Sequence, residues 1–436
     1  MQYPLRQHQP TNKNALSVHT PRWFHFFCGE RSLMPTRPLT MLCLASYEKG
    51  AEFMREVKRQ GWRVYLVTSE SIQNADWPRE SLDDIFLMPD DNKKWRLNDV
   101  ILGVSFLART HRIDRIVALD DFDVETAAAL REHLRVPGMG ETTGRYFRDK
   151  LAMRAKAREH GVPAPPFTPV FNDEVVREYV AETPGPWLVK PRSEASTIGI
   201  QRVNSPDELW ARLESLGDRR SFHLLEKFIP GDVYHVDSIV SEREVVFAAV
   251  SKYARPPIEV MHDGDVFATR IVEHDTDDEQ QLLELNRRVL QSMGMVCGAS
   301  HTEFIKAHAD GTYYFLETSA RVGGANIVEL VEAATGVNLW AEWAKLECAE
   351  PFGGYRPPPP RRDYAGLLIS LARQERPDTS AYNDPEVAWR LNKDFHAGLI
   401  VKSPSYDRIT HLLNDYMARF RVDFFARQPV PDRPTC

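Results

Sequence analysis

Short apolar runs alternate with amphipathic segments between residues 41 and 134, and this alternation constrains the fold more than any other feature of the sequence. It predicts four strands, at 41–46, 62–69, 85–89 and 114–120, and three helices, at 49–60, 97–110 and 123–134. Strands that alternate with helices form a parallel sheet. We therefore expect an α/β domain over 41–142. The turn after the first strand lacks the G-x-G-x-x-G pattern, which argues against a dinucleotide site there.

A second pattern, of the α+β class, follows from residue 143 to 350. It predicts helices at 143–160, 278–293 and roughly 325–346, and strands at 186–191, 223–231, 233–241, 244–253, 300–306 and 312–317. The strands 223–231 and 233–241 are expected to flank a Pro-Gly turn. The last two strands are expected to form a hairpin around Asp310-Gly311.

Both ends of the chain differ from this middle region. Residues 351–363 include four consecutive prolines and predict a stiff linker. Strands at 364–372 and 397–403 and a helix at 406–420 then predict a small C-terminal α+β domain over 364–436. Residues 1–40 show no periodicity, so we expect a disordered extension, or a mis-assigned start with Met34 or Met41 as the true one.

Charge and composition exclude several classes of function. The chain has 55 basic and 62 acidic residues, so nothing attracts it globally to nucleic acid or to an anionic membrane. Its apolar runs are shorter than the roughly 20 residues of a membrane span. The five cysteines form no C-x-x-C pair, which fits reduced thiols in the cytoplasm.

Two acids lie in the predicted hairpin. If its loop is 309–311, Glu303 lies directly opposite Glu317, with Cβ atoms about 5 Å apart. Two such carboxylates repel each other unless one is protonated or a cation lies between them, and Mg²⁺ suits carboxylate and phosphate oxygens. A two- or four-residue loop would place the acids on opposite faces. The alternative is that both are acids on an exposed rim.

Further polar residues near these strands suggest a phosphate ligand. Arg321 is followed by Gly323 and Gly324, which let the backbone approach a ligand at the start of a helix. Lys190 lies in a buried strand, before a loop of small residues that can cover phosphates; these are Ser193, Ser196, Thr197 and Gly199. An edge-strand lysine beside an ordinary turn explains this segment equally well. Taken singly, Lys150, Glu226, Lys227 and His235 carry no functional signal.

The order of four motifs resembles the ATP-grasp superfamily over about 41–346. They are RDK…GVPAPP, WLVKP with its small-residue loop, EKFIPGDVYHVD, and HTEF…YFLETSARVGG. The resemblance implies an α/β pre-ATP-grasp domain at 41–142 and a two-lobed ATP-grasp fold at 143–350, with ATP between the lobes. The overall class is then α/β and α+β, with a small C-terminal domain.

The resemblance also implies roles for single residues. Lys150 and Lys190 would contact ATP phosphates, under the loop from Ser193 to Gly199. Adenine would lie against the segment between the lobes, which comprises Glu226, Lys227, Phe228 and Ile229. His235 and Asp237 would lie near the ribose. Glu303 and Glu317 would bind Mg²⁺, or Mn²⁺, and Arg321 would act with Lys190 as a catalytic residue near the γ-phosphate.

Three positions depart from the superfamily pattern. Gly199 is the only glycine in the phosphate loop, Val233 replaces a frequent Glu, and Ser319 replaces a frequent Asn. A small residue at 319 resembles the L-amino acid ligase branch. We therefore predict a cytoplasmic ATP-dependent ligase that joins a small carboxylate to an amine through an acyl phosphate, with a homodimer compatible with the apolar helices of 41–142. The alternatives are a nucleotide-binding protein without activity and a biotin-carboxylase-like component.

Overall fold

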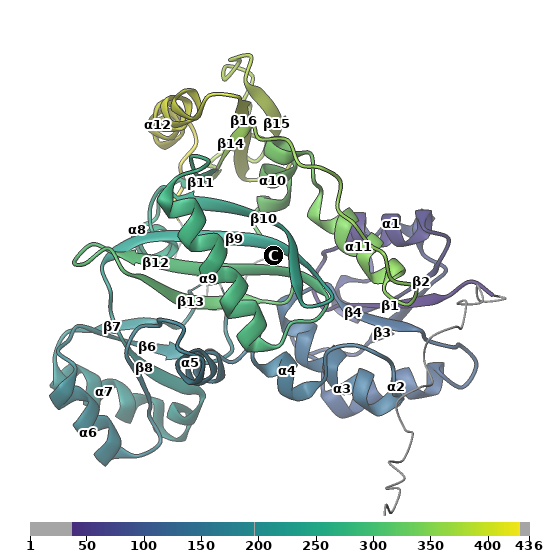
Figure 1. The fold of residues 1–436 in the computed structure, drawn as a ribbon, viewed down its shortest axis with the longest axis horizontal. Coiled ribbons are helices and arrows are strands. Elements are labelled where there is room, and N and C mark those ends of the chain that lie inside the picture. Colours follow the sequence, from purple (N-terminus) through teal and green to yellow (C-terminus); the bar gives the residue numbers. More distant parts are fainter. Residues whose placement is uncertain (1–36, 196, 428–436) are drawn as a thin grey trace, which may run out of the picture. The chain divides into compact units, whose positions relative to one another are not determined.

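The first four strands of the described chain form a parallel sheet, as the alternation predicts (Figure 1). The computed structural model describes residues 37–195 and 197–427, so most of the predicted extension at 1–40 lies outside the described residues. The strand order is β3-β2-β1-β4, with β1 (Thr40–Ala45), β2 (Arg63–Ser69), β3 (Asp84–Met88) and β4 (Arg115–Ala118). The helices are α1 (Ala51–Arg59), α2 (Leu97–Leu107) and α3 (Val124–Leu134).

Burial of β1 explains why the sheet carries helices on both faces. All six of its residues are buried. Met41 and Cys43 belong to one core cluster with α1, whereas Leu42 and Leu44 belong to another with α2 and α3. Successive strand residues point to opposite faces, so a strand that is apolar throughout requires cover on both sides.

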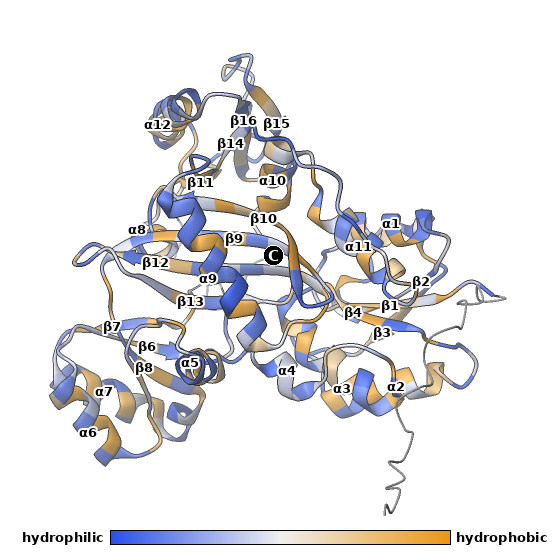
Figure 2. Cartoon of the chain, in the orientation of Figure 1, coloured by the Kyte–Doolittle hydropathy of each residue, from blue (hydrophilic) through white to orange (hydrophobic). Residues whose placement is uncertain are grey.

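An eight-stranded antiparallel sheet forms the largest part of the molecule. Its order is β13-β12-β9-β10-β11-β14-β16-β15. The strands are β9 (Gly231–Ser241), β10 (Glu244–Tyr253), β11 (Phe267–Ile271), β12 (Gly298–Ala307), β13 (Tyr313–Ser319), β14 (Tyr364–Leu371), β15 (Val387–Arg390) and β16 (His396–Ser403). Helix α9 (Asp277–Met293) crosses one face in Figure 1, and its apolar side packs on the sheet (Figure 2).

A smaller four-stranded sheet forms the other lobe of the predicted ATP-grasp fold. Its order is β5-β8-β6-β7, with β5 (Phe167–Pro169), β6 (Trp187–Pro191), β7 (Gln201–Val203) and β8 (His223–Lys227). Helices α6 (Asp173–Glu182) and α7 (Pro206–Leu216) pack on it through Val176, Leu209 and Leu213. The remaining elements include α8 (Pro257–Asp263), α12 (Tyr406–Asp423) and four 3₁₀ turns: η1 (Glu70–Ile72), η2 (Arg79–Ser81), η3 (Asp121–Asp123) and η4 (Gly217–Phe222).

Two predicted helices are each divided in the structure. The helix expected at 143–160 is α4 (Glu141–Arg145) and α5 (Lys150–Glu159), because the Asp149 side chain accepts hydrogen bonds from the first backbone N–H groups of α5. The helix expected at 325–346 is α10 (Ile327–Thr335) and α11 (Leu339–Ala349). Gly336, with φ 78°, ends α10, and the Asn338 side chain caps α11.

The predicted strand pair around the Pro-Gly turn is wrong, because β8 and β9 belong to different sheets. Strand β8 pairs with β5 and β6, whereas β9 pairs with β10 and β12. Residues 228–230 cross from one sheet to the other. A Cβ at Gly231 would lie 2.3 Å from the carbonyl oxygen of Lys306, so glycine lets β9 begin close beside β12.

The acid-bearing hairpin has the predicted pairing but a different loop. Glu303 pairs with Glu317 across β12 and β13. Nearer the turn, Ala307 donates a hydrogen bond to the carbonyl of Thr312, so the loop has four residues, 308–311, and not the predicted three. A bulge at Leu316 inserts one residue into β13 and restores the register.

The strands after the Pro-rich segment extend the large sheet. Strand β14 pairs with β11 and β16, and α12 packs its buried Ile409 and Leu413 in the same core cluster as Leu368 and Leu399. The division at 351–363 into a separate C-terminal domain stays a prediction. Among the described residues, no helix is both long enough and apolar enough to cross a membrane.

Candidate nucleotide-binding site

A cavity of about 530 Å³ is lined by residues of both the small sheet and the large sheet. Its lining brings together most of the residues that the motifs single out, namely Lys150, Lys190, Thr197, Glu226, Lys227, Phe228, Ile229, Glu303 and Glu317. These residues are spread over 168 positions of sequence, from Lys150 to Glu317, and the fold places them around one space. The cavity is therefore the candidate nucleotide site.

The side chains of Arg154, Glu226 and Lys190 form a buried triad, and two of them, Glu226 and Lys190, line the cavity. Glu226 accepts a hydrogen bond from Arg154 Nε at 2.7 Å on one carboxylate oxygen, and from Lys190 Nζ on the other. Burial would raise the pKa of Glu226, but Arg154 and Lys190 lower it below its ordinary value. Lys190 is thus held in place by an ionised acid, and a phosphate that binds it must compete with that acid.

Lys150 links three parts of the site. It is the first residue of α5, and its Nζ lies 2.7 Å from Glu317 Oε2 and 2.7 Å from the backbone carbonyl of Glu194. The helix start, the acid hairpin and the small-residue loop therefore meet at one ammonium group.

The segment between the sheets supplies an apolar wall. Phe228 and Ile229 line the cavity, and the Phe228 N–H donates to the carbonyl of Pro186. The Arg202 guanidinium lies 4.4 Å from the centre of the Phe228 ring, a cation–π contact. This wall is flat and apolar enough to lie against a nucleotide base.

The two paired acids have different surroundings. Glu303 accepts a hydrogen bond from the Tyr253 hydroxyl at 2.8 Å, and its Oε1 lies 3.6 Å from His301 Nε2. Its side chain is 17% exposed, against 34% for Glu317. Burial would raise the pKa of Glu303, but the His301 imidazole and the Tyr253 hydroxyl lower it. An ionised Glu303 opposite Glu317 provides the oxygen ligands that Mg²⁺ prefers, so these residues fit such an ion.

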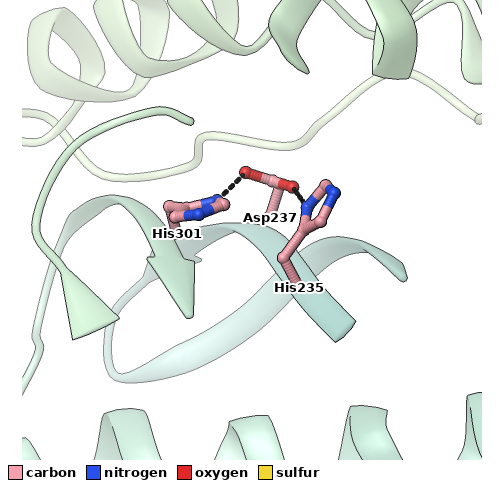
Figure 3. Close-up of side chains that lie close together, drawn as sticks. All are labelled: His235, Asp237 and His301. Carbon is pink, nitrogen blue, oxygen red and sulfur yellow. Dashed lines mark hydrogen bonds and ion pairs between the residues drawn. The ribbon is translucent and has the colours of Figure 1, made fainter. Parts of the chain in front are cut away.

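His235, which the motifs place near the ribose, lies outside the cavity lining. It is fully buried, and its Nδ1 lies 2.7 Å from Asp237 Oδ2 while its Nε2 lies 2.8 Å from Thr269 Oγ1. His301 Nδ1 lies 2.8 Å from the other oxygen of Asp237 (Figure 3). Because the two imidazoles contact different oxygens of Asp237, the three side chains form a hydrogen-bonded row.

The imidazole of His301, at one end of this row, lies next to Glu303, one of the two paired acids. Burial would lower the pKa of His301, but Asp237 raises it to about 9. Asp237 in turn has a pKa far below its usual range, since the two histidines outweigh burial. His301 is therefore cationic near neutral pH and lies between Asp237 and Glu303.

Arg321 and Ser319 both contact Asp121, which follows strand β4 closely in the chain. Both contact Asp121 Oδ2, with Arg321 Nη2 at 3.3 Å and Ser319 Oγ at 3.2 Å. Arg148 Nη1 lies 3.6 Å from the same oxygen. Burial would raise the pKa of Asp121, but Arg321 and Arg148 lower it to about 2. Arg321 does not line the cavity. Its guanidinium is held by Asp121, which lies 200 residues earlier in the chain.

The loop predicted to cover phosphates is only partly in the cavity. Thr197 lines it, whereas Ser193 and Gly199 are exposed and do not. The Ser193 carbonyl accepts a hydrogen bond from Arg148, and Gly199 has φ 71°, which favours glycine. Ser196 lies outside the described residues.

The sequence reasoning missed three residues of this site. Arg154, which pairs with Glu226, follows Lys150 by four positions, and helical spacing would have placed both on one face of α5. Asp121 and Tyr253 contact Arg321 and Glu303 across long stretches of chain. No local pattern marks either of them.

Comparison with known proteins identifies the family of part of the chain. Residues 147–325 match the family model of the ATP-grasp domain. The chain therefore contains an ATP-grasp domain, as its motifs predict. It is 26% identical over 233 residues to an L-arginine-specific L-amino acid ligase of Bacillus subtilis, a match that covers 52% of this chain and 56% of that ligase. The chain thus spans little more than half the length of this relative.

Solved structures share the fold over nearly the whole chain. An L-amino acid ligase from Bacillus licheniformis has a TM-score of 0.68 and 16% identity, over 90% of this chain and 100% of the other. The N5-carboxyaminoimidazole synthetase of Staphylococcus aureus complexed with ADP has a TM-score of 0.66 and 15% identity, over 88% and 97%. These likenesses confirm the predicted fold: a parallel α/β domain followed by an ATP-grasp fold.

Proposed function

We propose that the protein is an ATP- and Mg²⁺-dependent ligase that joins the carboxylate of one amino acid to the amine of another. One observation carries the proposal: two lysines and two paired acids converge on a single cavity that also has an apolar wall. Cations, metal-binding oxygens and a flat apolar surface are together what a magnesium nucleotide requires. The similarity to L-amino acid ligases and the small Ser319 support amino acids as substrates.

The reaction has two steps with a balanced exchange of groups. An oxygen of the substrate carboxylate attacks the γ-phosphorus of ATP, and ADP leaves. The nitrogen of the amine then attacks the acyl carbon of the acyl phosphate, inorganic phosphate leaves, and the nitrogen loses one proton. Neither step requires a covalent bond to the protein, so the residues act by position and charge.

Each residue group has a distinct part in this mechanism. Lys150 and Lys190 would neutralise phosphate oxygens, and Arg321 would stabilise the charge that develops between the γ-phosphate and the acceptor carboxylate. Glu303 and Glu317 would hold Mg²⁺, which neutralises phosphate charge when bound. Phe228 and Ile229 offer their apolar surface to the base. Asp121 and Arg154 act through Arg321 and Glu226, so we assign them positioning roles.

Phosphate release tests the proposal directly. Purified protein would be incubated with ATP, Mg²⁺ and pools of amino acids, and inorganic phosphate and ligated products would be measured. We expect release that depends on particular amino acids, together with a product of the summed mass less one water. Silence across broad pools, with ATP binding retained, would instead favour a nucleotide-binding protein without ligase activity.

A matched pair of variants tests the metal assignment. Glu317→Gln removes one negative charge at constant size, and we expect phosphate release to fall by at least about 100-fold. Glu284→Gln changes an exposed acid of α9 that pairs with Arg287, and we expect it to retain activity. Unchanged release in Glu317→Gln would exclude the proposed metal role.

A further inference from the structure

A second cavity, of about 410 Å³, lies outside the nucleotide site. It is lined by residues of β4, α3, α11, the segment 138–143 and the segment 294–298. We call it the arginine cavity, because Arg115, Arg131 and Arg243 all line it. Its lining also contains Ile116, Met295, Val296 and Trp343, so the charged groups share the space with apolar surface.

Arg131 enters this cavity without an acidic partner among the described residues. Its Nε and Nη2 donate to the carbonyl of Ile116 at 2.8 and 2.6 Å, and its Nη1 donates to the carbonyl of Met139 at 3.1 Å. A guanidinium carries five N–H groups, so two remain. Burial lowers the pKa of Arg131 to about 10, which means that its charge is incompletely compensated.

The acids in the lining are already engaged by another arginine. Arg115 Nη2 lies 2.6 Å from Glu347 Oε2, and Arg115 Nη1 lies 2.9 Å from Glu350 Oε2. Glu347 also accepts a hydrogen bond from Trp343 Nε1 at 3.1 Å. Arg243, at the turn between β9 and β10, is exposed, and no described acid forms an ion pair with it. Arg131 and Arg243 therefore have no ion-pair partner among the described residues, and three arginines against two glutamates leave the lining with one net positive charge.

The backbone around Arg131 is shaped to keep the guanidinium in place. Gly138 has φ 137°, and a Cβ there would lie 2.7 Å from Arg131 Cδ. Any other residue would displace the side chain or strain the turn. The carbonyls of Ile116 and Met139 thus fix the guanidinium of Arg131, and Gly138 leaves space for its side chain. Arg131 also lines the cavity.

We propose that the arginine cavity binds a small monocarboxylate with an apolar body. A carboxylate can accept paired hydrogen bonds from a guanidinium fork, and the remaining donors of Arg131 and the free Arg243 supply them. The apolar lining receives the rest of the ligand. A dianionic phosphate is disfavoured, since Glu347 and Glu350 lie in the same lining. The inference does not rest on the proposed ligase activity.

Binding of 4-bromobenzoate, an unreactive monocarboxylate with an anomalous scatterer, tests the site without ATP or metal. Crystals soaked with it should show a bromine peak inside the arginine cavity. Calorimetric titration of the full chain should show binding that Arg131→Met weakens by at least tenfold. Arg243→Met, which alters an exposed side chain, should weaken binding as well and covers the case in which Arg131→Met does not fold. Arg135→Met, an exposed arginine of the same helix end outside the lining, is the matched control.

The other outcomes would overturn the proposal. These are a bromine peak only in the nucleotide site or on the surface, equal binding by all variants, and binding of inorganic phosphate in the arginine cavity with no binding of the carboxylate. Phosphate release with amino acids is measured in a separate assay without 4-bromobenzoate. The proposal of a carboxylate site and the proposal of a ligase can therefore fail independently of each other.

Discussion

The two cavities differ in how their positive charges are compensated. In the candidate nucleotide site, Lys190 and Lys150 each contact a carboxylate, of Glu226 and Glu317. In the arginine cavity, Arg131 donates its hydrogen bonds to backbone carbonyls and forms no ion pair with any described residue. A ligand of the first cavity must therefore displace acids or bring a cation for them, whereas a ligand of the second can add its charge without breaking an ion pair. The presence of cationic side chains does not distinguish these two situations. The groups that those side chains contact, carboxylates in one cavity and backbone carbonyls in the other, distinguish them.

The largest expected effect concerns the buried ion pairs of Glu226 in the candidate nucleotide site. Glu226→Gln would leave Arg154 and Lys190 buried without an acid, and removing one partner of a buried ion pair costs about 3–5 kcal/mol. We expect the free energy of unfolding in urea to fall by that amount. Glu284→Gln, at an exposed pair, should change it by less than about 0.5 kcal/mol. A loss below about 1 kcal/mol for Glu226→Gln would mean that the triad is not compensated as described.

A pH-dependent stability follows from the row of His235, Asp237 and His301. The pKa of His301 is raised from 6.5 to about 9 on folding, so the folded state binds its proton more tightly. The resulting stability is complete below pH 6.5 and is lost as the pH rises through 9. With each pKa unit equal to about 1.4 kcal/mol, the loss is roughly 3–4 kcal/mol.

Unfolding measurements at pH 6 and pH 9.5, without nucleotide or metal, test this dependence. We expect His301→Gln to be less stable than wild type at pH 6 and to lose less stability on going to pH 9.5. His133→Gln, at an exposed helical position, should keep the wild-type profile. Identical profiles for wild type and His301→Gln would show that Asp237 does not hold a charged imidazole.

Lys150 tests whether nucleotide binding exchanges ion-pair partners. Lys150→Met removes the ammonium that bridges Glu317 and the Glu194 carbonyl. We expect the affinity for ATP with Mg²⁺ to fall about 10- to 100-fold, in the range of a charge-assisted contact with phosphate. Binding of 4-bromobenzoate should remain unchanged, because Lys150 lies outside the arginine cavity. If both affinities fell together, the two cavities would not be independent.

The smallest expected effect concerns Gly138 in the arginine cavity. Gly138→Ala forces a side chain into a backbone conformation with φ 137° and against Arg131 Cδ. We expect a loss of about 1–2 kcal/mol in the free energy of unfolding, with weaker 4-bromobenzoate binding and normal phosphate release. Gly311 also has a positive φ, of 71°, but open space around it, so Gly311→Ala is the control. It should lose stability while keeping full carboxylate binding.

Local patterns predicted much of the architecture. The apolar runs and their spacing gave the parallel sheet, and the paired acids were placed opposite each other correctly. The reasoning behind that pairing was wrong in one detail, since the loop has four residues and the Leu316 bulge restores the register. The residues of the two strands do not show where such an extra residue is inserted, and bulges are common at sheet edges, where β13 lies. The predicted strand pair at 223–241 failed because pairing partners 32 to 76 residues away decided which sheet each strand joins.

The sequence by itself determined the class of chemistry available to this protein. Lysines in a strand and at a helix start, acids in a hairpin and a small-residue loop are local choices, and each can be read within a few residues. Tertiary structure alone decided which of these groups are compensated and by what. Asp121 reaches Arg321 across 200 positions, His235 is withdrawn from the cavity, and Arg131 is left with carbonyls. Charge compensation is a property of distances in space, and long-range contacts set those distances only when the chain has folded.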